Sequence, residues 1–201
     1  MEQTEQNFAR LTAEISRVVE ESMKVNIAVM ESLAERRIVD DKTSWTDKVA
    51  FMETEAKRTG FQMFAVTDLE GRTVFFNTER TAHNIGDRAY FKRAVSGIST
   101  YSEVVISKDT GQPVVTVAVP LKRNGRITGV LFGMRDGDEI SKLVAGIKIG
   151  ETGYAYIISS NGSVQGHKDN KLIINQYNPI KAAEGNRDLL PLAEFLKNAI
   201  A

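Results

Sequence analysis

The stretch Gly86-Asp87-Arg88-Ala89-Tyr90-Phe91-Lys92-Arg93-Ala94-Val95 is the part of the sequence around which the rest is organised. It brings one guanidinium and two aromatic rings within four residues, at the start of what its spacing predicts to be a short helix. A permanent cation beside ring faces suits a small anion such as a carboxylate. Apolar runs continue from this stretch to Met134. We therefore expect a scaffold that presents a small-molecule pocket, and a sensor, not an enzyme.

The composition is that of an ordinary soluble globular protein, with 42% hydrophobic and 26% charged residues in 201. Lys and Arg together equal Asp and Glu, 26 of each, which argues against a nucleic-acid or acidic-membrane partner. The absence of cysteine removes thiol catalysis, iron–sulfur ligation and disulfides. The two histidines, His83 and His167, are far apart in the sequence. We expect neither a metal site nor a cofactor.

Motifs typical of enzymes are not found in the sequence. It has no Gly-x-Ser-x-Gly elbow, no phosphate-binding glycine loop with a lysine and no His-Glu-x-x-His. Asp136, Asp138 and Glu139 allow a calcium or magnesium site as one reading, but acidic residues at a helix N-terminus explain them better. No apolar run is long enough to span a membrane, and the polar first residues predict no signal peptide. If the parent protein is a membrane receptor, we expect this chain to be a piece excised from it.

Two helices are predicted before the first strand. Residues 4 to about 39 repeat apolar side chains every three or four positions without Gly or Pro, which predicts one long helix of roughly 50 Å at ~1.5 Å per residue. Two explanations for its length stay open, packing along its own domain or a spine that pairs with a partner chain. A second helix begins after a cap at Thr43 or Ser44 and ends at Gly60, with Trp45 in its buried stripe.

From Phe61 the apolar period changes from helix to strand. Runs 61–67 and 72–77 flank an Asp68–Gly71 turn, and a loop over 78–87 leads into a short helix over 88–96. Three further strands are predicted over 101–107, 113–121 and 126–134, the last two joined by Asn124-Gly125, a strong hairpin signal. The fold class is therefore α+β, with a long N-terminal helix followed by an antiparallel five-stranded sheet.

The remainder of the chain predicts a second, partial lobe. A helix over 136–145 is followed by a strand at 154–159, a Ser160–Gly162 turn and a short strand through Gln165, and a helix over 188–200 comes last. A second five-stranded sheet needs more strands than these. We expect three parts: residues 1–60 with the two helices, residues 61–146 with the ligand-binding lobe, and residues 147–201 with an incomplete lobe.

Four segments together resemble the double Cache family of bacterial extracellular sensors. They are Ile85–Ala94, Thr110–Pro120, Gly129–Gly133 and Ile149–Ile157, in the order in which the family has them. The resemblance covers the chain from Phe8 to about Pro179 and implies a membrane-distal PAS-like lobe that binds a small molecule and a smaller proximal PAS-like lobe. It also implies transmembrane helices outside this chain, an extracellular or periplasmic location, and a parent protein that is a chemoreceptor, a histidine kinase or a diguanylate cyclase.

In amino-acid-binding members of the family, an Arg and two nearby aromatic residues hold the carboxylate, and an acidic residue late in the sheet holds the ammonium group. Arg88, Tyr90 and Phe91 match the first set. The family's acidic position falls on Met134, with Asp136 two residues on. Other family positions fall on residues of different type, Val105 and Ser107 before the Thr-Gly turn and His83 five residues before Arg88. The resemblance therefore implies a pocket for a small organic anion, a carboxylate or amino acid, in which the part that holds the carboxylate matches the family and the part that holds an ammonium group does not.

Several readings stay open at the level of single residues and of the whole chain. Arg88 could also cap its helix or pair with Asp87 or Glu103, and only one of Tyr90 and Phe91 is expected to face the pocket, because neighbours on a helix point ~100° apart. Other polar candidates for the pocket are Tyr101, Ser107, Thr116, Asp136 and His83. The alternative functions are a ligand-free scaffold that forms a homodimer through the N-terminal helix, and an intracellular PAS-type cofactor domain.

Overall fold

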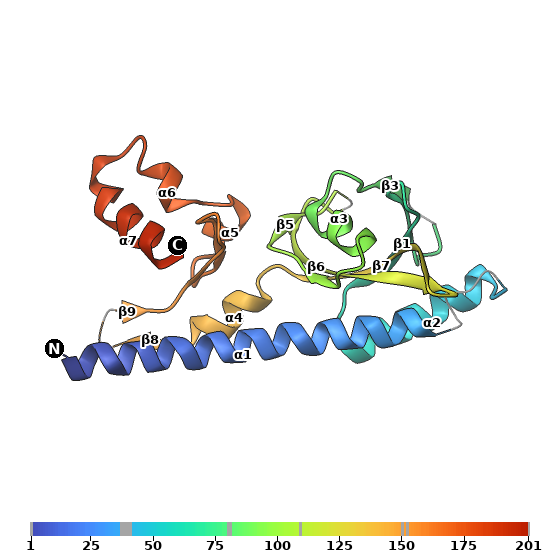
Figure 1. Ribbon diagram of the computed structural model, residues 1–201, viewed down its shortest axis with the longest axis horizontal. Coiled ribbons are helices and arrows are strands. Elements are labelled where there is room, and N and C mark those ends of the chain that lie inside the picture. The colour runs from blue at the N-terminus through green and yellow to red at the C-terminus, as the bar shows by residue number, and fades with distance from the viewer. Residues whose placement is uncertain are drawn as a thin grey trace. The chain divides into compact units, whose positions relative to one another are not determined.

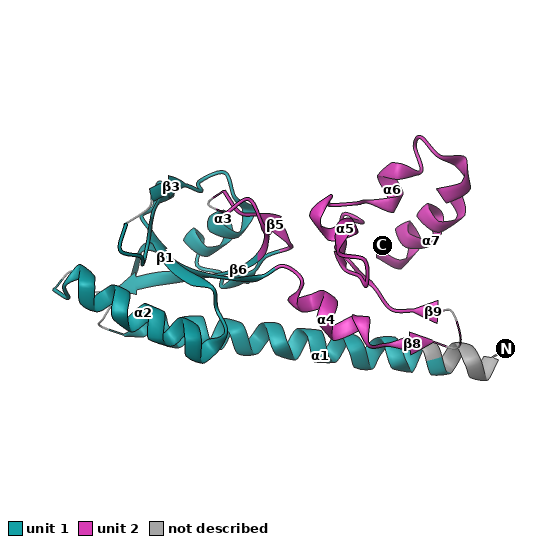
Figure 2. Cartoon of the chain, turned by 180° about the vertical axis from the view of Figure 1, so that it is seen from behind, with its two compact units in different colours: residues 1–102, 115–136 teal, residues 103–114, 137–201 magenta. Residues whose placement is uncertain are grey.

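The computed structural model of the protein describes residues 2–36, 42–79, 82–108, 110–149, 151 and 153–200, without the side chains of residues 2–6 and 8. The chain forms two compact units (Figure 2). Unit 1 holds residues 1–102 and 115–136, and unit 2 holds residues 103–114 and 137–201. Figure 1 shows the elements in order. Among the described residues, no helix combines the length and the apolar character needed to cross a bilayer.

Unit 1 begins with two helices, as the sequence predicts. Helix α1 covers Glu2–Glu35 and helix α2 covers Trp45–Thr59. The Ser44 hydroxyl accepts a hydrogen bond from the backbone N–H of Asp47, and Gly60 ends α2 in the left-handed conformation at φ 77°. Both caps are confirmed, whereas the expected last turn of α1, toward residue 39, extends into residues outside the description.

The strands form one antiparallel sheet in the order β3-β2-β1-β7-β6-β4, with β5 also paired to β6. The bounds of the strands are β1 Met63–Thr67, β2 Arg72–Phe75, β3 Ala82–Asn84, β4 Thr100–Tyr101, β5 Val105–Ile106, β6 Pro113–Arg123 and β7 Arg126–Asp136. Asn124 and Gly125 have φ of 51° and 76°, the left-handed pair that a tight hairpin turn requires, so the predicted β6–β7 hairpin is confirmed. The α+β class predicted from the sequence is confirmed as well.

The sheet departs from the five expected strands at two places. β3 lies in a segment predicted to be a loop, where Ala82-His83-Asn84 pairs with Val74, Thr73 and Arg72 at the sheet edge. The single strand predicted over 101–107 is wrong. It is two short strands, β4 and β5, and between them the Ser102 hydroxyl accepts a hydrogen bond from the N–H of Thr116.

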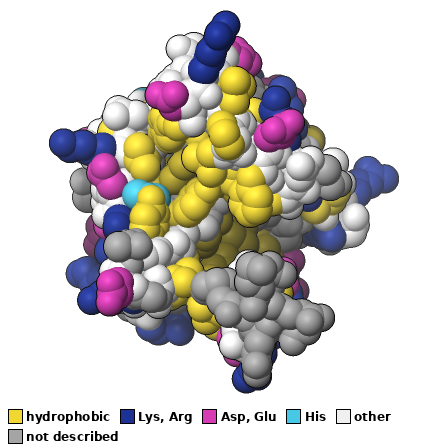
Figure 3. Space-filling model, turned by 90° about the vertical axis from the view of Figure 1, so that its left-hand side faces the viewer, with side chains coloured by type: hydrophobic (Ala, Val, Ile, Leu, Met, Phe, Trp, Pro, Cys, Tyr) yellow, Lys and Arg dark blue, Asp and Glu magenta, His cyan; other side chains and the backbone are white. Residues whose placement is uncertain are grey.

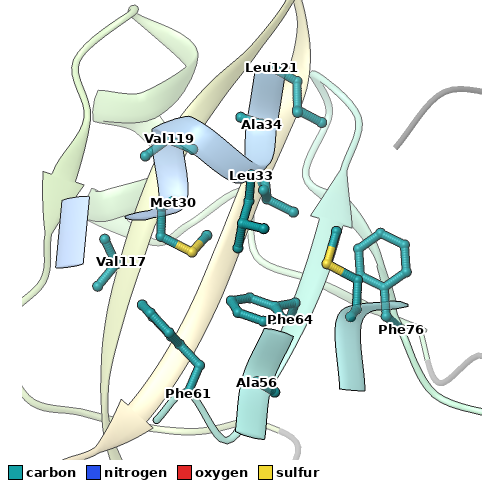
Figure 4. Close-up of a cluster of buried hydrophobic side chains, with 12 residues drawn as sticks. Met30, Leu33, Ala34, Ala56, Phe61, Phe64, Phe76, Val117, Val119 and Leu121 are labelled. Atoms are coloured by element: carbon teal, nitrogen blue, oxygen red, sulfur yellow. The ribbon is translucent and has the colours of Figure 1, made fainter. Parts of the chain in front are cut away.

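One face of the sheet is covered by α1 and α2, which build the main apolar core (Figure 4). Helix α1 contributes Met30, Leu33 and Ala34, and Phe64 and Leu131 come from the central strands β1 and β7. Because side chains alternate across a strand, the neighbours of these sheet residues face the other side. Helix α3, Ala89–Val95, packs against β7 and β4, and Gly97 ends the segment at φ 95°.

Unit 2 is made of short elements that pack on one another. Its helices and remaining strands are α4 Glu139–Ala145, β8 Lys148–Ile149, β9 Gly153–Tyr154, β10 Ile157–Ile158, β11 Val164–Gly166, α5 Asn170–Ile174, α6 Pro179–Ala182, the 3-10 turn Arg187–Leu189 and α7 Leu190–Ile200. The predicted hairpin around Ser160–Gly162 is present as the antiparallel pair β10–β11, with Gly162 at φ 85°, but the single strand predicted over 154–159 is wrong, because Tyr154 belongs to β9, which pairs with β8. Helices α5 and α6 and strand β8 are missing from the sequence prediction, because each is too short to show an apolar period.

Apolar side chains reach the surface of unit 2 in number. Leu190 and Phe195 of α7 are 51% and 67% exposed, and Tyr154 is 42% exposed. Figure 3 shows apolar side chains gathered on the face that it presents. His167 is buried beside the Tyr154 ring, with ring centroids 5.1 Å apart.

Candidate functional site

The site predicted from the sequence begins at the residue that precedes α3. Arg88 is extended, at φ −72° and ψ 134°, and its backbone N–H donates to the carbonyl of Ile85 at 2.9 Å. Its carbonyl accepts from the N–H of Lys92 at 3.2 Å, which starts the helix. The Arg88 side chain gives α3 no capping hydrogen bond, and its Nε atom is buried. The Arg88 side chain therefore extends into the protein interior and does not cap α3.

Tyr90 lies near two other residues predicted for the site, Arg88 and Thr116. Its side chain is 8% exposed, and this burial raises the pKa of the Tyr90 hydroxyl. The positive charge of Arg88 opposes that rise in pKa, and the Thr116 side chain lies close enough to the Tyr90 hydroxyl to act in the same direction, although the buried Oγ1 atom of Thr116 makes no hydrogen bond within the described residues. Thr116 lies on β6 and is 1% exposed. A guanidinium, a phenol and a hydroxyl from two elements thus meet beneath α3, on the sheet face opposite to α1 and α2.

A row of rings continues from Tyr90 across the same face. The Tyr90 ring centroid lies 6.2 Å from that of Phe132 on β7, and Phe132 lies 5.9 Å from Phe75 on β2 in an edge-to-face contact. Phe75 is in turn 5.9 Å from the ring of His83 on β3. His83 pairs with Thr73 in the sheet register, which explains why it shares a face with Phe75. The structure therefore connects His83 to the Arg88 region through aromatic contacts.

Phe75 and Phe132 are members of this face that sequence reasoning missed. Phe132 lies in a run of β7 that is buried on both faces, and Phe75 ends the short strand Arg72–Phe75, in which the residues sharing its face include the polar Thr73. The pairing register shows which face each ring occupies, because Ala65 of β1 pairs with Phe75 of β2 on one side and with Phe132 of β7 on the other. Residues paired across adjacent strands point to the same face.

Other predicted residues lie elsewhere. Tyr101 pairs with Val117 on β6 and packs against the apolar core under α1 and α2, the face opposite to Thr116. Phe91 is buried in α3 at 5% exposure. Asp136 is the last residue of β7 and is exposed.

Ser107 belongs to unit 2, whereas the other predicted site residues belong to unit 1. Its hydroxyl accepts a hydrogen bond from the N–H of Thr110 at 3.2 Å, and its carbonyl accepts from the N–H of Gly111 at 3.0 Å. Ser107 thus holds the turn between β5 and β6.

Asp138, one of the acidic residues near the end of β7, has a structural explanation. The Asp138 carboxylate forms an ion pair with Lys142 Nζ at 2.7 Å, one helical turn along α4. In the described part of the chain, no three His, Asp or Glu side chains gather in a way that could hold a metal ion.

Comparison with known proteins gives the same family that the sequence motifs indicate. The family model of the Cache domain matches residues 1–195. The methyl-accepting chemotaxis protein PscA of Pseudomonas syringae pv. tomato is 29% identical over 92 residues, which cover 45% of this chain and 15% of that protein. The chain therefore spans only a small part of the length of that receptor.

Two solved structures share the fold at low sequence identity. The ligand-binding domain of the Pseudomonas fluorescens chemoreceptor CtaA, in complex with L-serine, has a TM-score of 0.72 at 18% identity, covering 92% of this chain and 80% of that one. The ligand-binding domain of the Pseudomonas aeruginosa amino-acid chemoreceptor PctC, in complex with GABA, has a TM-score of 0.72 at 17% identity, covering 90% and 82%. Fold and family model agree, and the chain belongs to the Cache domain family.

Proposed function

We propose that this chain is the extracytoplasmic ligand-binding domain of a bacterial transmembrane chemoreceptor, and that unit 1 binds a small organic anion, a carboxylate or an amino acid. The family model and the fold shared with CtaA and PctC support a sensor domain. The matched chemotaxis protein supports a chemoreceptor as the parent, ahead of a histidine kinase or a diguanylate cyclase.

The observation that carries the proposal is that the Arg88 Nε atom and the Thr116 hydroxyl are buried near the Tyr90 side chain beneath α3. That face also carries buried apolar side chains, with Phe132 2% and Val130 0% exposed, together with the buried hydroxyl residues Thr67 and Thr73. A carboxylate placed there would gain charge-assisted hydrogen bonds from the guanidinium and further ones from the two hydroxyls. The aromatic row from Tyr90 to His83 would contact the remainder of the ligand. Of the residues predicted from the sequence, Arg88, Tyr90, Thr116 and His83 fit this role best.

The proposal is tested by thermal shift with a panel of organic acids, amino acids and amines that includes L-serine and GABA. We expect at least one acid to raise the melting temperature of the wild-type chain and to fail with Arg88→Ala. Lys92→Ala is the matched control, because Lys92 is an exposed cation one turn further along α3, and it should respond like wild type. No response to any compound would overturn the proposal and favour a ligand-free scaffold.

We further propose that α1 pairs with α1 of a second copy and carries the signal toward the membrane. Leu11, Val18 and Val25 are apolar, 38%, 46% and 61% exposed, and recur every seven residues. Residues at this spacing fill one of the two apolar positions of each heptad in the seam of a two-stranded coiled coil. Ligand binding in unit 1 would favour one of two arrangements of the lobe against this helix.

The pairing is tested by sedimentation. Val18→Glu with Val25→Glu should lower the dimer population of the chain. Ala13→Glu with Ser16→Glu is the matched control, because it adds the same charge at two exposed positions of α1 that lie ~140–200° around the helix from Leu11. This control should leave the population unchanged. An unchanged dimer population in the Val18 and Val25 variant, or a wild-type chain that stays monomeric, would contradict pairing through this stripe.

A further inference from the structure

Unit 2 contains a cavity of about 240 Å³ that the site in unit 1 does not use. Its walls come from the Glu103–Val105 segment, from strand β11 and the turn before it, and from α5, α6 and the chain between them. All of these segments belong to unit 2. At ~30 Å³ per water the cavity has room for about eight water molecules, which is the size of a small metabolite and not of a peptide.

Gln165 and Gln176 hold the backbone of Val104 from both sides at this cavity. The Oε1 atom of Gln165 accepts a hydrogen bond from the N–H of Val104 at 2.6 Å, and the Nε2 atom of Gln176 donates to its carbonyl at 3.4 Å. Gln165 is 7% exposed. Because these bonds fix which end of each amide is oxygen, the remaining ends are a two-hydrogen donor on Gln165 and an acceptor on Gln176.

The donor on Gln165 is available to a ligand. No described residue accepts a hydrogen bond from its Nε2 atom, although the residue is buried. An amide donor that no protein group receives is left to bond with water or with a ligand. A ligand in this cavity should therefore present a hydrogen-bond acceptor to Gln165 Nε2.

Two opposite charges line the same cavity. Lys181 is exposed, and among the described carboxylates none forms an ion pair with it. Glu103 lies on the wall formed by the 103–105 segment and accepts a hydrogen bond from Asn161 Nδ2 at 3.3 Å. Val104, Val164 and Ile173 are 4%, 3% and 1% exposed and supply an apolar surface between the polar groups.

We infer that this cavity is a second small-molecule site, for a zwitterionic compound of amino-acid type. The Gln165 amide and the Lys181 ammonium are donors for a carboxylate, and the Gln176 oxygen and the Glu103 carboxylate are acceptors for an ammonium group. A plain carboxylate would meet the repulsion of Glu103 without a compensating group of its own. The site therefore favours a zwitterion over an anion of the same size.

The experiment is an NMR titration of the full chain with L-serine and, separately, with acetate, followed at the Val104 backbone amide and the Gln176 side-chain amide. We expect L-serine at ~10 mM, which nearly fills a site with a Kd of ~1 mM, to shift both resonances, and acetate to shift them much less.

Gln165→Glu is the decisive variant, because it keeps an oxygen for the Val104 N–H and replaces the donor by a carboxylate oxygen. It should weaken L-serine binding at least tenfold, and Lys181→Gln should weaken it severalfold. Lys171→Gln, an exposed lysine of α5 that does not line the cavity, is the matched control and should bind like wild type.

Arg88→Ala separates this inference from the proposed function of unit 1. The Val104 and Gln176 shifts should persist in that variant, because Arg88 belongs to the other unit. The inference is overturned if L-serine produces no shift, if acetate binds as well as L-serine, if Gln165→Glu binds normally, or if the shifts vanish with Arg88→Ala.

Discussion

Single residues in this protein are placed by close packing against rings, and Gly133 is the clearest case. It lies on β7 in the face that α1 and α2 cover, beside Phe61 and Phe64. A Cβ at this position would stand 2.6 Å from Phe61 Cδ1 and 2.8 Å from Phe64 Cδ1. The position thus needs a glycine for space, because the two rings occupy the volume of a side chain.

Gly133→Ala should lower the free energy of unfolding by about 1–3 kcal/mol, the usual result of overpacking a core. Chemical denaturation with urea measures this loss. Gly146→Ala is the control, since Gly146 has φ −80° and a methyl group added there would have no atom within 4 Å; it should change stability by less than about 1 kcal/mol. Equal effects of the two substitutions would contradict the packing described for Gly133.

The buried carboxyl of Glu55 should make the stability of the fold depend on pH. Glu55 lies on α2 and is 7% exposed. Its carboxylate accepts a hydrogen bond from Arg58 Nε at 3.2 Å, and this bond lowers the pKa of the Glu55 carboxyl below 4.5. Burial acts in the opposite direction but is the weaker effect. A pKa lower in the folded than in the unfolded state adds stability that is present above the unfolded pKa and lost as pH falls through the folded one.

The melting temperature should therefore fall more steeply below about pH 4.5 in the wild type than in Glu55→Gln. Arg58→Gln removes the partner and should flatten the same part of the profile. Parallel curves for the wild type and both variants, measured by calorimetry, would contradict a role for this pair.

The sequence predicts which residue types form the candidate site better than it predicts the face of the sheet to which each side chain points. Arg88, Tyr90 and Thr116 are all candidates from the sequence, and they meet beneath α3. Tyr101 is a candidate as well, but it packs under α1 and α2. The difference of one position decides the face of a strand, and the residues near Tyr101 do not alternate in polarity clearly enough to reveal the strand's register.

At the scale of elements, the ends of α2 are predictable because they depend on local chemistry. Ser44 caps the first turn through the N–H of Asp47, at 3.2 Å, and Gly60 ends the last turn. The hairpin at Asn124-Gly125 has the same local origin. In contrast, β3 owes its extended form to pairing with β2, and α5 and α6 are too short to carry a periodic signal.

Ser44→Ala should cost about 1 kcal/mol of stability, because a first-turn N–H loses its acceptor. Thermal unfolding monitored by circular dichroism measures it. Ser32→Ala provides the comparison, since Ser32 is exposed in α1 and alanine favours the helix there by a few tenths of a kcal/mol. A Ser44 variant as stable as the wild type would show that the cap contributes nothing to α2.

At the scale of the whole molecule, the segment 103–114 matters because it is covalently continuous with unit 1 on both sides and belongs to unit 2. Ser102, the last residue before it, is bound to Thr116 by two hydrogen bonds, of 2.8 and 2.9 Å. Val104, two residues later, is held by Gln165. The change of unit therefore occurs within two residues, and each side has its own backbone anchor.

Gln165→Ala should speed hydrogen exchange at the Val104 amide, because the buried N–H loses its acceptor at a cost of about 1–3 kcal/mol. Exchange should rise by roughly tenfold for each 1.4 kcal/mol of lost local stability. Gln165→Glu keeps an acceptor and should preserve protection. Slow exchange at Val104 in the alanine variant would mean that another contact holds the segment.

The path of the backbone between the units has a consequence for how such Cache domains can be re-engineered or shuffled in evolution. The chain passes from one unit to the other after residues 102, 114 and 136. No single crossover point can exchange one lobe for that of a relative and leave the other intact. A chimaera that grafts a foreign sensing lobe must carry the 103–114 loop of the recipient, or it will lose part of the lobe that it was meant to keep.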